Sequence, residues 1–337
     1  KIVMPQDEFS LINYYFANRS ACRSDVAIGI GDDGAVVKPL PEHDLVVVTD
    51  TLVEGVHFDK TTPPRAIGHK AVAVNLSDLA AMGAQPSWIS LALTCPNTDN
   101  DWLAEFSSGL DEICRYYDCQ LIGGDTTKGP LTVTVTAHGQ LPTGTAISRS
   151  GAKPGDWVYV SGSLGDAGLG LKVTQNKVST TGRHLQHVIE RLHYPTPRVA
   201  MGQVLRGVAT SCIDVSDGLV ADLGHLLKQA QVSAQIELEK LPLSLALTET
   251  LEANEALAMA LTAGDDYELC FTLPEEHRGR METLTSHLKT KPVCIGRIVK
   301  GAEAQIDMHY EGEPWELPEG YKSFNHFATD EWVRKGE

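Results

Sequence analysis

Gly29-Ile30-Gly31-Asp32-Asp33-Gly34 leads into Ala35-Val36-Val37 near the start of the chain. The first six residues fit the pattern G-x-G-x-x-G, which is typical of loops that let a phosphate approach the backbone. Two adjacent carboxylates, however, stand where a dinucleotide-binding loop has neutral residues and the start of a helix. Since carboxylates repel phosphate, the loop favours a phosphate site bridged by a metal cation. A dinucleotide-binding dehydrogenase, which would bind NAD without metal, is the alternative that this pattern leaves open.

The length and composition of the chain indicate a globular protein of two domains. At 337 residues the chain exceeds the size of one typical hydrophobic core. Hydrophobic residues make up 42% and charged residues 21%, as in ordinary folded proteins. The formal charge of −16 comes from 28 basic and 44 acidic residues. It argues against a nucleic-acid partner, because that binding depends on basic contacts to phosphate.

Several features of the sequence predict a cytoplasmic protein without membrane association. No apolar run approaches the roughly 18 residues that span a bilayer. Residues 1–5 lack the apolar core and cleavage site of a signal peptide. The cysteines at positions 22, 95, 114, 119, 212, 270 and 294 form no C-x-x-C pair. We interpret most of them as buried, reduced thiols, with a thiol nucleophile or a zinc site as the alternative.

Helix and strand patterns alternate along both halves of the chain. Helical spacing of apolar residues predicts a helix over 7–18, and a second helix is expected between Pro63-Pro64 and Gly83. In the first half we also expect strands at 45–48, 88–94, 119–122 and 131–136 and a helix at 102–117, with Thr49-Asp50-Thr51 ending the first strand. In the second half we expect strands at 157–160, 269–273 and 292–298 and helices at 197–208, 219–230 and 275–288.

The domain boundary is expected in residues 149–156, which are dense in turn-forming residues. This places an N-terminal domain at 1–148 and a C-terminal domain at 149–337. Shortly after the boundary, Asp166 follows Gly165 and is interpreted as a helix N-cap rather than a site residue.

Asp78 lies on the same helical face as Ala71, Val74 and Met82. An acid within an apolar stripe is costly unless it is paired or binds a metal. The local pattern therefore leaves two interpretations open: a metal ligand, or a helix-end residue bonded to a neighbouring backbone amide.

Aspartates beside glycine, serine or threonine recur along the chain, each at the expected end of an apolar strand or helix. A single such turn has only conformational meaning, but their number suggests one shared site. Two carboxylates about 4 Å apart repel by about 4 kcal/mol at an effective dielectric near 20, so a cluster of them needs cations. Oxygen-only ligands suit Mg²⁺ rather than zinc. The turns are Asp32-Asp33, Thr49-Asp50, Asp125-Thr126 and 214–217, with Asp78 as a further acid.

Seven segments occur in order: 29–37, 49–51 with His57, 75–83, 123–127, 149–151, 213–218 and 264–268. Together they resemble the thiamine-monophosphate kinase family, of the aminoimidazole-ribonucleotide-synthetase-like superfamily. The resemblance covers about residues 7 to 327, nearly the whole chain. It implies a Mg²⁺-dependent enzyme that transfers the γ-phosphate of ATP to thiamine phosphate, giving thiamine diphosphate and ADP. It also implies an α/β architecture of two domains, in which an N-terminal mixed sheet with helices pairs in a homodimer and the C-terminal domain is an α/β sandwich.

The resemblance assigns roles to individual positions of this sequence. Metal-site positions, for several Mg²⁺ ions, are Asp33, Thr49, Asp50, Asp78, Asp125, Asp214 and Asp217. ATP-contacting positions are Gly124, Asp125, Arg149 and Ser216. Positions on the thiamine-phosphate side are His57, Asp265 and Tyr321, with Trp315 as a second choice for stacking on the thiamine ring. Two departures are Val48, where some members carry a hydroxyl, and Asp265, where a relative can have glutamate.

The acceptor in such a reaction is a phosphate oxygen, which is already anionic near neutral pH. We therefore expect direct in-line transfer without a general base. Two other functions remain possible for this sequence. One is another ATP-dependent member of the superfamily, such as aminoimidazole ribonucleotide synthetase or selenophosphate synthetase, although Cys22 lacks the glycine-rich setting of a reactive selenophosphate-synthetase cysteine. The other is a non-catalytic Mg-nucleotide sensor.

Overall fold

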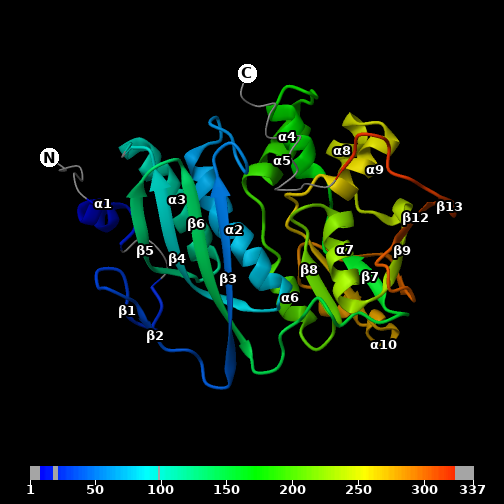
Figure 1. Ribbon diagram of the computed structural model, residues 1–337, viewed down its shortest axis with the longest axis horizontal. Helices are drawn as coiled ribbons and strands as arrows, with labels where there is room; N and C mark the ends of the chain where they lie inside the picture. The colour runs from blue at the N-terminus through cyan, green and yellow to red at the C-terminus, as the bar shows by residue number, and fades with distance from the viewer. Residues whose placement is uncertain (1–7, 18–21, 98, 323–337) are drawn as a thin grey trace. The chain divides into compact units, whose positions relative to one another are not determined.

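The computed structural model describes residues 8–17, 22–97 and 99–322 of the chain (Figure 1). The chain divides into two compact units. The first holds Lys1–Ser148 together with His193–Ala209, and the second holds Arg149–Leu192 together with Thr210–Glu337. The expected first helix is present as α1, Glu8–Tyr15, whereas Asp7 and Asn18 lie outside the described residues.

The first unit is built on a four-stranded mixed sheet in the order β3-β6-β4-β5 (Figure 1). Strands β4 and β5 run parallel, and the other neighbours are antiparallel. A separate pair, β1 with β2, lies on either side of the glycine loop at residues 29–34. The strands are β1 (Val26–Ile28), β2 (Val36–Val37), β3 (His43–Val53), β4 (Gln85–Cys95), β5 (Gln120–Lys128) and β6 (Thr132–Pro142).

Two long helices, α2 (Pro64–Ala81) and α3 (Asn100–Tyr116), pack on each other, and α2 also packs on β3 and β6. Their ends follow from local chemistry. Pro64 occupies the first turn of α2, where its missing N–H costs nothing. Gly83, at φ 77°, follows the end of α2 in the left-handed conformation. The carboxylate of Asp99 caps α3 by accepting bonds from two backbone amides of its first turn.

Glycines let the backbones of α2 and α3 approach closely. A Cβ atom on Gly68 would lie 2.1 Å from the carbonyl oxygen of Phe106. On the facing helix, a Cβ atom on Gly109 would lie 1.9 Å from the carbonyl oxygen of Arg65. Neither distance leaves room for a side chain, so this crossing requires glycine in both helices.

The second unit contains a seven-stranded sheet in the order β13-β12-β9-β11-β7-β10-β8, in which only β12 and β9 pair in parallel. Its core includes fully buried Val158, Leu223 and Ile295. The strands are β7 (Trp157–Val160), β8 (Ser211–Asp214), β9 (Ser233–Glu237), β10 (Leu269–Leu273), β11 (Val293–Val299), β12 (Ile306–Tyr310) and β13 (Glu313–Pro314). The helices are α4 (Asp166–Thr174), α5 (Gly182–His193), α7 (Leu219–Ala230), η1 (Leu238–Lys240), α8 (Leu245–Thr250), α9 (Ala253–Thr262), α10 (Glu275–Arg278) and α11 (Met281–Leu284).

The predicted α/β class with two domains is thus confirmed, and four local predictions are corrected. Thr49-Asp50-Thr51 does not end its strand, because β3 continues to Val53 and pairs with β6 along its whole length. Asp125 likewise lies inside β5 rather than in a turn after it. The helix expected at 275–288 is two short helices separated near Gly279, and the helix expected at 197–208 is the shorter α6, Val199–Leu205. Within the described residues, no helix combines the length and the hydropathy of a membrane span.

Candidate functional site

Strand β3 presents its candidate residues on two faces of the sheet. Thr49 pairs with Thr136 of β6, and their hydroxyl oxygens lie 3.0 Å apart on an exposed face. Because side chains alternate along a strand, Asp50 points to the other face, together with the buried Leu52. Helix α2 packs on β3, and the burial of Leu52 indicates that it covers this second face.

Asp78 is carried by α2, the helix that packs on β3. Fourteen residues of α2 are buried, whereas Asp78 is only partly so. Asp78 and Asp50 each make polar or electrostatic interactions. Asp50 and the helix that carries Asp78 therefore lie on one side of the sheet, and both side chains are carboxylates suited to a hard cation.

Asp125 in β5 belongs to the other face of the same sheet. It pairs with Ala92 of β4, which pairs with Thr134 of β6, which in turn pairs with Thr51 of β3. Directly paired residues share a face, so Asp125 lies on the exposed face of the threonines. Asp125 and Asp50 therefore lie on opposite faces of the sheet. The sequence, which shows both only as acids in turns, does not predict this separation.

The opening loop contains no helix start. Asp33 is exposed between β1 and β2, and its backbone amide donates to Asp32 Oδ1 at 2.9 Å. Val36 and Val37, which follow the loop, form the short strand β2. A dinucleotide-binding loop requires a helix at this point, so the dehydrogenase alternative is wrong.

His57 lies in the turn after β3, and its ring is held there by the backbone of Val53. Its Nδ1 accepts a hydrogen bond from the Val53 amide at 3.0 Å. A nitrogen that accepts an N–H bond carries no proton, so the ring is the tautomer with its proton on Nε2. His57 therefore offers one N–H donor from a half-buried ring.

Backbones meet closely at Gly124, a predicted ATP-contacting position, and at Gly151, two residues after the predicted position Arg149. A Cβ atom on Gly124, at φ 150°, would lie 1.8 Å from the carbonyl oxygen of Leu91. Arg149 is exposed at the start of the second unit. Two residues later, a Cβ atom on Gly151 would lie 1.8 Å from the carbonyl oxygen of Thr210. The segment that carries Arg149 is thereby held against the beginning of β8.

In the second unit, the acidic turn follows β8. Asp214 is the last residue of that strand and is 4% exposed, whereas Ser216 and Asp217 are half-buried. The amide of Val215 donates to the Glu268 carbonyl at 2.8 Å, which joins the turn to the segment before β10. This turn presents three oxygen-bearing side chains within four residues.

Asp222, in the first turn of α7, is a residue that the motif analysis did not single out. Its Oδ2 accepts hydrogen bonds from the amides of Ser216 and Asp217, both at 2.9 Å. Burial raises the pKa of the Asp222 carboxyl to about 7, although the bond from the Asp217 amide acts in the opposite direction. The sequence feature that could have identified Asp222 is its position in the first turn of α7, five residues after Asp217.

Asp265 lies in the loop between α9 and β10 and is half-buried. Its Oδ1 accepts a hydrogen bond from the hydroxyl of Tyr267 at 3.2 Å. The loop also runs beside the acidic turn, because the amide of Asp265 donates to the carbonyl of Ser216 at 2.8 Å. The structure thus brings together a predicted substrate residue and a predicted ATP-contacting residue.

Of the two aromatic candidates for stacking, Tyr321 is the less engaged. Its ring is half-buried, and Lys172 Nζ lies 5.3 Å from the ring centroid. Trp315 packs against the core of the second unit, and its Nε1 donates to Asn254 Oδ1 at 3.1 Å. Trp315 is thus held by core packing and a hydrogen bond, whereas the ring of Tyr321 has a lysine ammonium over it.

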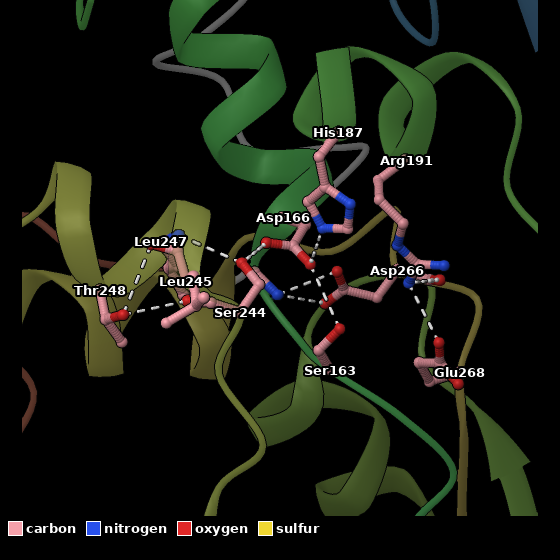
Figure 2. A network of polar contacts seen from close by, with 11 residues as sticks. Ser163, Asp166, His187, Arg191, Ser244, Leu245, Leu247, Thr248, Asp266 and Glu268 are labelled. Atoms are coloured by element: carbon pink, nitrogen blue, oxygen red, sulfur yellow. Dashed lines mark hydrogen bonds and ion pairs between the residues drawn. The ribbon is translucent and has the colours of Figure 1, made fainter. Parts of the chain in front are cut away.

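Asp166 is not a helix cap, which corrects the prediction (Figure 2). The cap position is Gly165, in the left-handed conformation, and the Asp166 side chain is fully buried. Its oxygens accept from Ser163 at 3.2 Å, from His187 at 3.0 Å and from the hydroxyl of Ser244. The buried carboxylate of Asp166 thus connects its own segment to the two segments that carry His187 and Ser244.

The thiols are unpaired, and most of them are buried, as expected. Burial raises the pKa of Cys119 and of Cys270 to about 12, which makes both poor nucleophiles at neutral pH. In the described part of the chain, no three His, Cys, Asp or Glu side chains form a ready-made metal cluster. The donors that each unit does present are carboxylate and hydroxyl oxygens, the set that fits Mg²⁺.

Family models match both halves of the chain. Residues 31–141 match the N-terminal domain of AIR synthase related protein, and residues 153–309 match its C-terminal domain. Thiamine-monophosphate kinase of Escherichia coli (strain K12) is 47% identical over 323 residues, covering 96% of this chain and 98% of that protein. The enzyme of the same name from Haemophilus influenzae is 44% identical, covering 88% and 90%.

Solved structures agree with these matches. Thiamine-monophosphate kinase from Stenotrophomonas maltophilia K279a is similar with a TM-score of 0.80 at 44% identity, over 87% of this chain and 93% of that one. AaThiL complexed with AMPPCP and TMP is similar with a TM-score of 0.73 at 32% identity, over 88% and 92%. The hydrogenase maturation protein HypE of E. coli, at 20% identity and a TM-score of 0.69, shares the fold alone. This chain belongs to the thiamine-monophosphate kinase family.

Proposed function

We propose that this chain is a kinase that transfers the γ-phosphate of ATP to the phosphate of thiamine monophosphate, giving thiamine diphosphate and ADP. The observation that carries the proposal is 47% identity over nearly the whole length of an enzyme named for this activity. A similar structure complexed with AMPPCP and TMP supports ATP and thiamine monophosphate as the two substrates. The reaction is a step in the biosynthesis of thiamine diphosphate.

We further propose that the acidic residues hold Mg²⁺ ions. When bound, Mg²⁺ neutralises phosphate charge and so allows two phosphorylated substrates to approach. The oxygen-only donor set of both units supports this assignment, as does the location of Asp50 on the face that α2 covers. The residues proposed to hold the metals are Asp33, Thr49, Asp50, Asp78, Asp125, Asp214 and Asp217.

ATP is proposed to contact Gly124, Asp125, Arg149 and Ser216. Two properties of the residues support this set. Gly124 lies in β5, an edge strand of the sheet, at a point where a Cβ atom would collide with the carbonyl oxygen of Leu91. Arg149 is an exposed guanidinium, the group best suited to bind a phosphate chain in a planar, two-pronged contact.

Thiamine monophosphate joins a phosphate, a cationic thiazolium ring and an aromatic pyrimidine. The three residues proposed to bind it match these parts. His57 offers the N–H of Nε2 to a phosphate oxygen, Asp265 offers a carboxylate to a cation, and Tyr321 offers an aromatic face. None of them needs to remove a proton, because the acceptor phosphate is already anionic. The chain's contribution is therefore positioning and charge compensation for in-line transfer.

We also propose a homodimer formed through the first unit. Leu45 and Val47 of β3 are 46% and 58% exposed, on the face opposite to α2. Val36 of β2, 47% exposed, adds to the apolar surface of this unit. Exposed apolar patches of this kind are typical of association sites. We propose a cytoplasmic location because the thiols are unpaired and the reaction uses ATP. We also propose that the boundary between the two domains lies between residues 148 and 149.

The test is an assay with ATP, Mg²⁺ and a panel of acceptors, in which thiamine monophosphate is compared with aminoimidazole ribonucleotide precursors and with selenide, and the products are resolved by chromatography. We expect ADP and thiamine diphosphate in equal amounts, and only with thiamine monophosphate. ATP binding without ADP formation would instead identify a nucleotide sensor. Turnover of another acceptor would identify a different activity of the superfamily.

A further inference from the structure

The loop that carries Asp265 has an unusual backbone. Gly264, Asp265 and Tyr267 all have positive φ, at 75°, 58° and 51°. Residues with side chains rarely adopt this conformation, and it persists only where the surroundings impose it. At Gly264 the conformation also brings the backbone close to Ser216, whose carbonyl oxygen would lie 2.5 Å from an added Cβ.

One side of this loop is fixed by the acidic turn after β8. The amide of Asp265 donates to the carbonyl of Ser216 at 2.8 Å, and the amide of Tyr267 donates to the carbonyl of Val215 at 2.8 Å. These two bonds define where the loop runs. The second bond holds the peptide group between Asp266 and Tyr267 by its N–H, and the carbonyl of the same group is bonded elsewhere.

Arg191 of α5 holds the carbonyl of this peptide group (Figure 2). Its Nη2 donates to the backbone carbonyl of Asp266 and to Glu268 Oε1, both at 3.1 Å. The Arg191 side chain is 13% exposed, and the Glu268 side chain is fully buried. One buried nitrogen thus holds two points of the loop at once.

The Asp266 side chain points away from Arg191 and is fixed separately. Both of its carboxylate oxygens accept from the amide of Gly165, at 2.9 and 3.1 Å. Burial raises the pKa of Asp266 well above its usual value, and the charge of Arg191 opposes that rise. Glu268 receives a further bond from the hydroxyl of Ser161. The positive charge of Arg191 therefore offsets the cost of burying the carboxyl groups of Asp266 and Glu268.

We propose that Arg191 is a positioning residue for thiamine monophosphate. It holds the Asp266 carbonyl and Glu268, and so keeps the left-handed loop in the conformation that presents Asp265. The inference rests on the proposed function, because Asp265 is the residue through which Arg191 acts. Arg191 acts through the loop, which it holds by the two bonds from its Nη2. Loss of its contact lets Asp265 move, which weakens binding of thiamine monophosphate and leaves binding of ATP unchanged.

The main variant is chosen so that Glu268 is not left as a buried anion without its cation. Removing Arg191 alone would leave Glu268 as a buried anion and could prevent folding. The double variant R191M/E268Q removes both charges together with the contact to the Asp266 carbonyl. The single variant E268Q removes the ion pair but keeps that contact. R183M, at an exposed position of the same helix, is the control for a lost cation.

We expect R191M/E268Q to raise the KM for thiamine monophosphate by about tenfold or more, with the KM for ATP within about twofold of the unchanged chain. E268Q and R183M should keep both KM values. R191K should recover most of the lost affinity, because a single nitrogen makes both contacts. A double-mutant cycle adds the specific readout: in a D265N background, R191M/E268Q should have no further effect on the KM for thiamine monophosphate.

Three results would overturn the inference. They are an unchanged KM for thiamine monophosphate in R191M/E268Q, an equal rise in both KM values, or an effect that adds fully to that of D265N. The melting temperature of each variant separates loss of fold from loss of positioning. If the unchanged chain forms no thiamine diphosphate at all, the proposed function fails and the inference with it. Normal turnover by the unchanged chain with no effect of the variants refutes the inference alone.

Discussion

Asp222 Oδ2 lies 2.9 Å from the backbone nitrogen of Asp217, and the same oxygen accepts the amide of Ser216. One carboxylate therefore fixes the turn that carries a proposed metal ligand and a proposed ATP contact. Two amides that point inward from a turn need such an acceptor, because an unpaired buried N–H is costly.

Replacing Asp222 with alanine should disorganise this turn. We expect D222A to need about 10-fold to 100-fold more Mg²⁺ for half-maximal activity, as is common when a group that orients a metal ligand is lost. The free energy of unfolding should fall by about 1–3 kcal/mol, since two amides lose their acceptor. D222N keeps an acceptor oxygen and is the matched control, with a smaller effect on both. Unchanged Mg²⁺ dependence in D222A would contradict the positioning role.

Asp50 should be indispensable for turnover but not for folding. We expect D50N to abolish thiamine diphosphate formation, because the amide cannot offset the charge of a bound cation, while the circular dichroism spectrum stays unchanged. D44N is the control at the other end of the same strand, where the carboxylate accepts the Gly144 amide at 2.9 Å. Turnover by D50N at saturating Mg²⁺ would refute its metal role.

Charges on the exposed face of β3 should separate the proposed dimer. L45D/V47D puts two carboxylates where apolar side chains are exposed, so burial against a partner becomes unfavourable. Sedimentation velocity should show the mass of one chain for this variant and of two for the unchanged chain. L245D, which changes an equally exposed leucine of the second unit (61% exposed), should remain dimeric. Identical masses for all three proteins would argue against this interface.

The pair of His187 and Asp166 should make stability depend on pH. Hydrogen bonding to Asp166 raises the pKa of His187 above its usual 6.5, and the bond from His187 lowers the pKa of Asp166 against the effect of burial. The histidine contribution is complete below pH 6.5 and is lost as the pH rises through the raised pKa. The aspartate contribution is present above its usual pKa of 3.8 and is lost as the pH falls through the lowered value.

H187Q should therefore reduce the melting temperature most between about pH 4 and 6.5, and least near pH 8.5, where the imidazole is neutral. Arg191 and Glu190 also face this histidine with opposite effects on its charge. The companion variant D166N removes the partner, so in that background H187Q should cause no pH-dependent loss. An equal loss at pH 5.5 and pH 8.5 would show that the charge of His187 plays no part.

The sequence predicted correctly those helices and strands whose ends depend on the residues at the ends themselves. Pro64 and Gly83 marked α2 because each acts through its own backbone geometry, and Trp157–Val160 was recognised from its β-branched and aromatic residues. Thr49 and Asp125 were misplaced in turns, since their strand assignment depends on pairing with distant strands.

The same limit applies to the candidate site. The acidic motifs predicted candidate metal ligands, but they did not predict which of these residues lie on the same face of the sheet. That depends on the register between β3, β6, β4 and β5, which pair residues far apart in the sequence. Asp166 looked like a cap next to Gly165, yet its partners lie 21 and 78 residues further along the chain. Arg191 likewise contacts residues 75 and 77 positions away, and no local spacing predicts that.

The close packing of α2 on α3 at Gly68 and Gly109 also fixes the position of Asp78. Ten residues separate Gly68 from Asp78, which is about 15 Å along a helix. With no clearance between the backbones at Gly68 and Gly109, α2 cannot slide or rotate on α3, and any side chain introduced there would shift the whole helix as a rigid rod. Alanine at either glycine would thus displace a proposed metal ligand without altering a single oxygen donor, and the resulting enzyme would fail through misalignment rather than through missing chemistry.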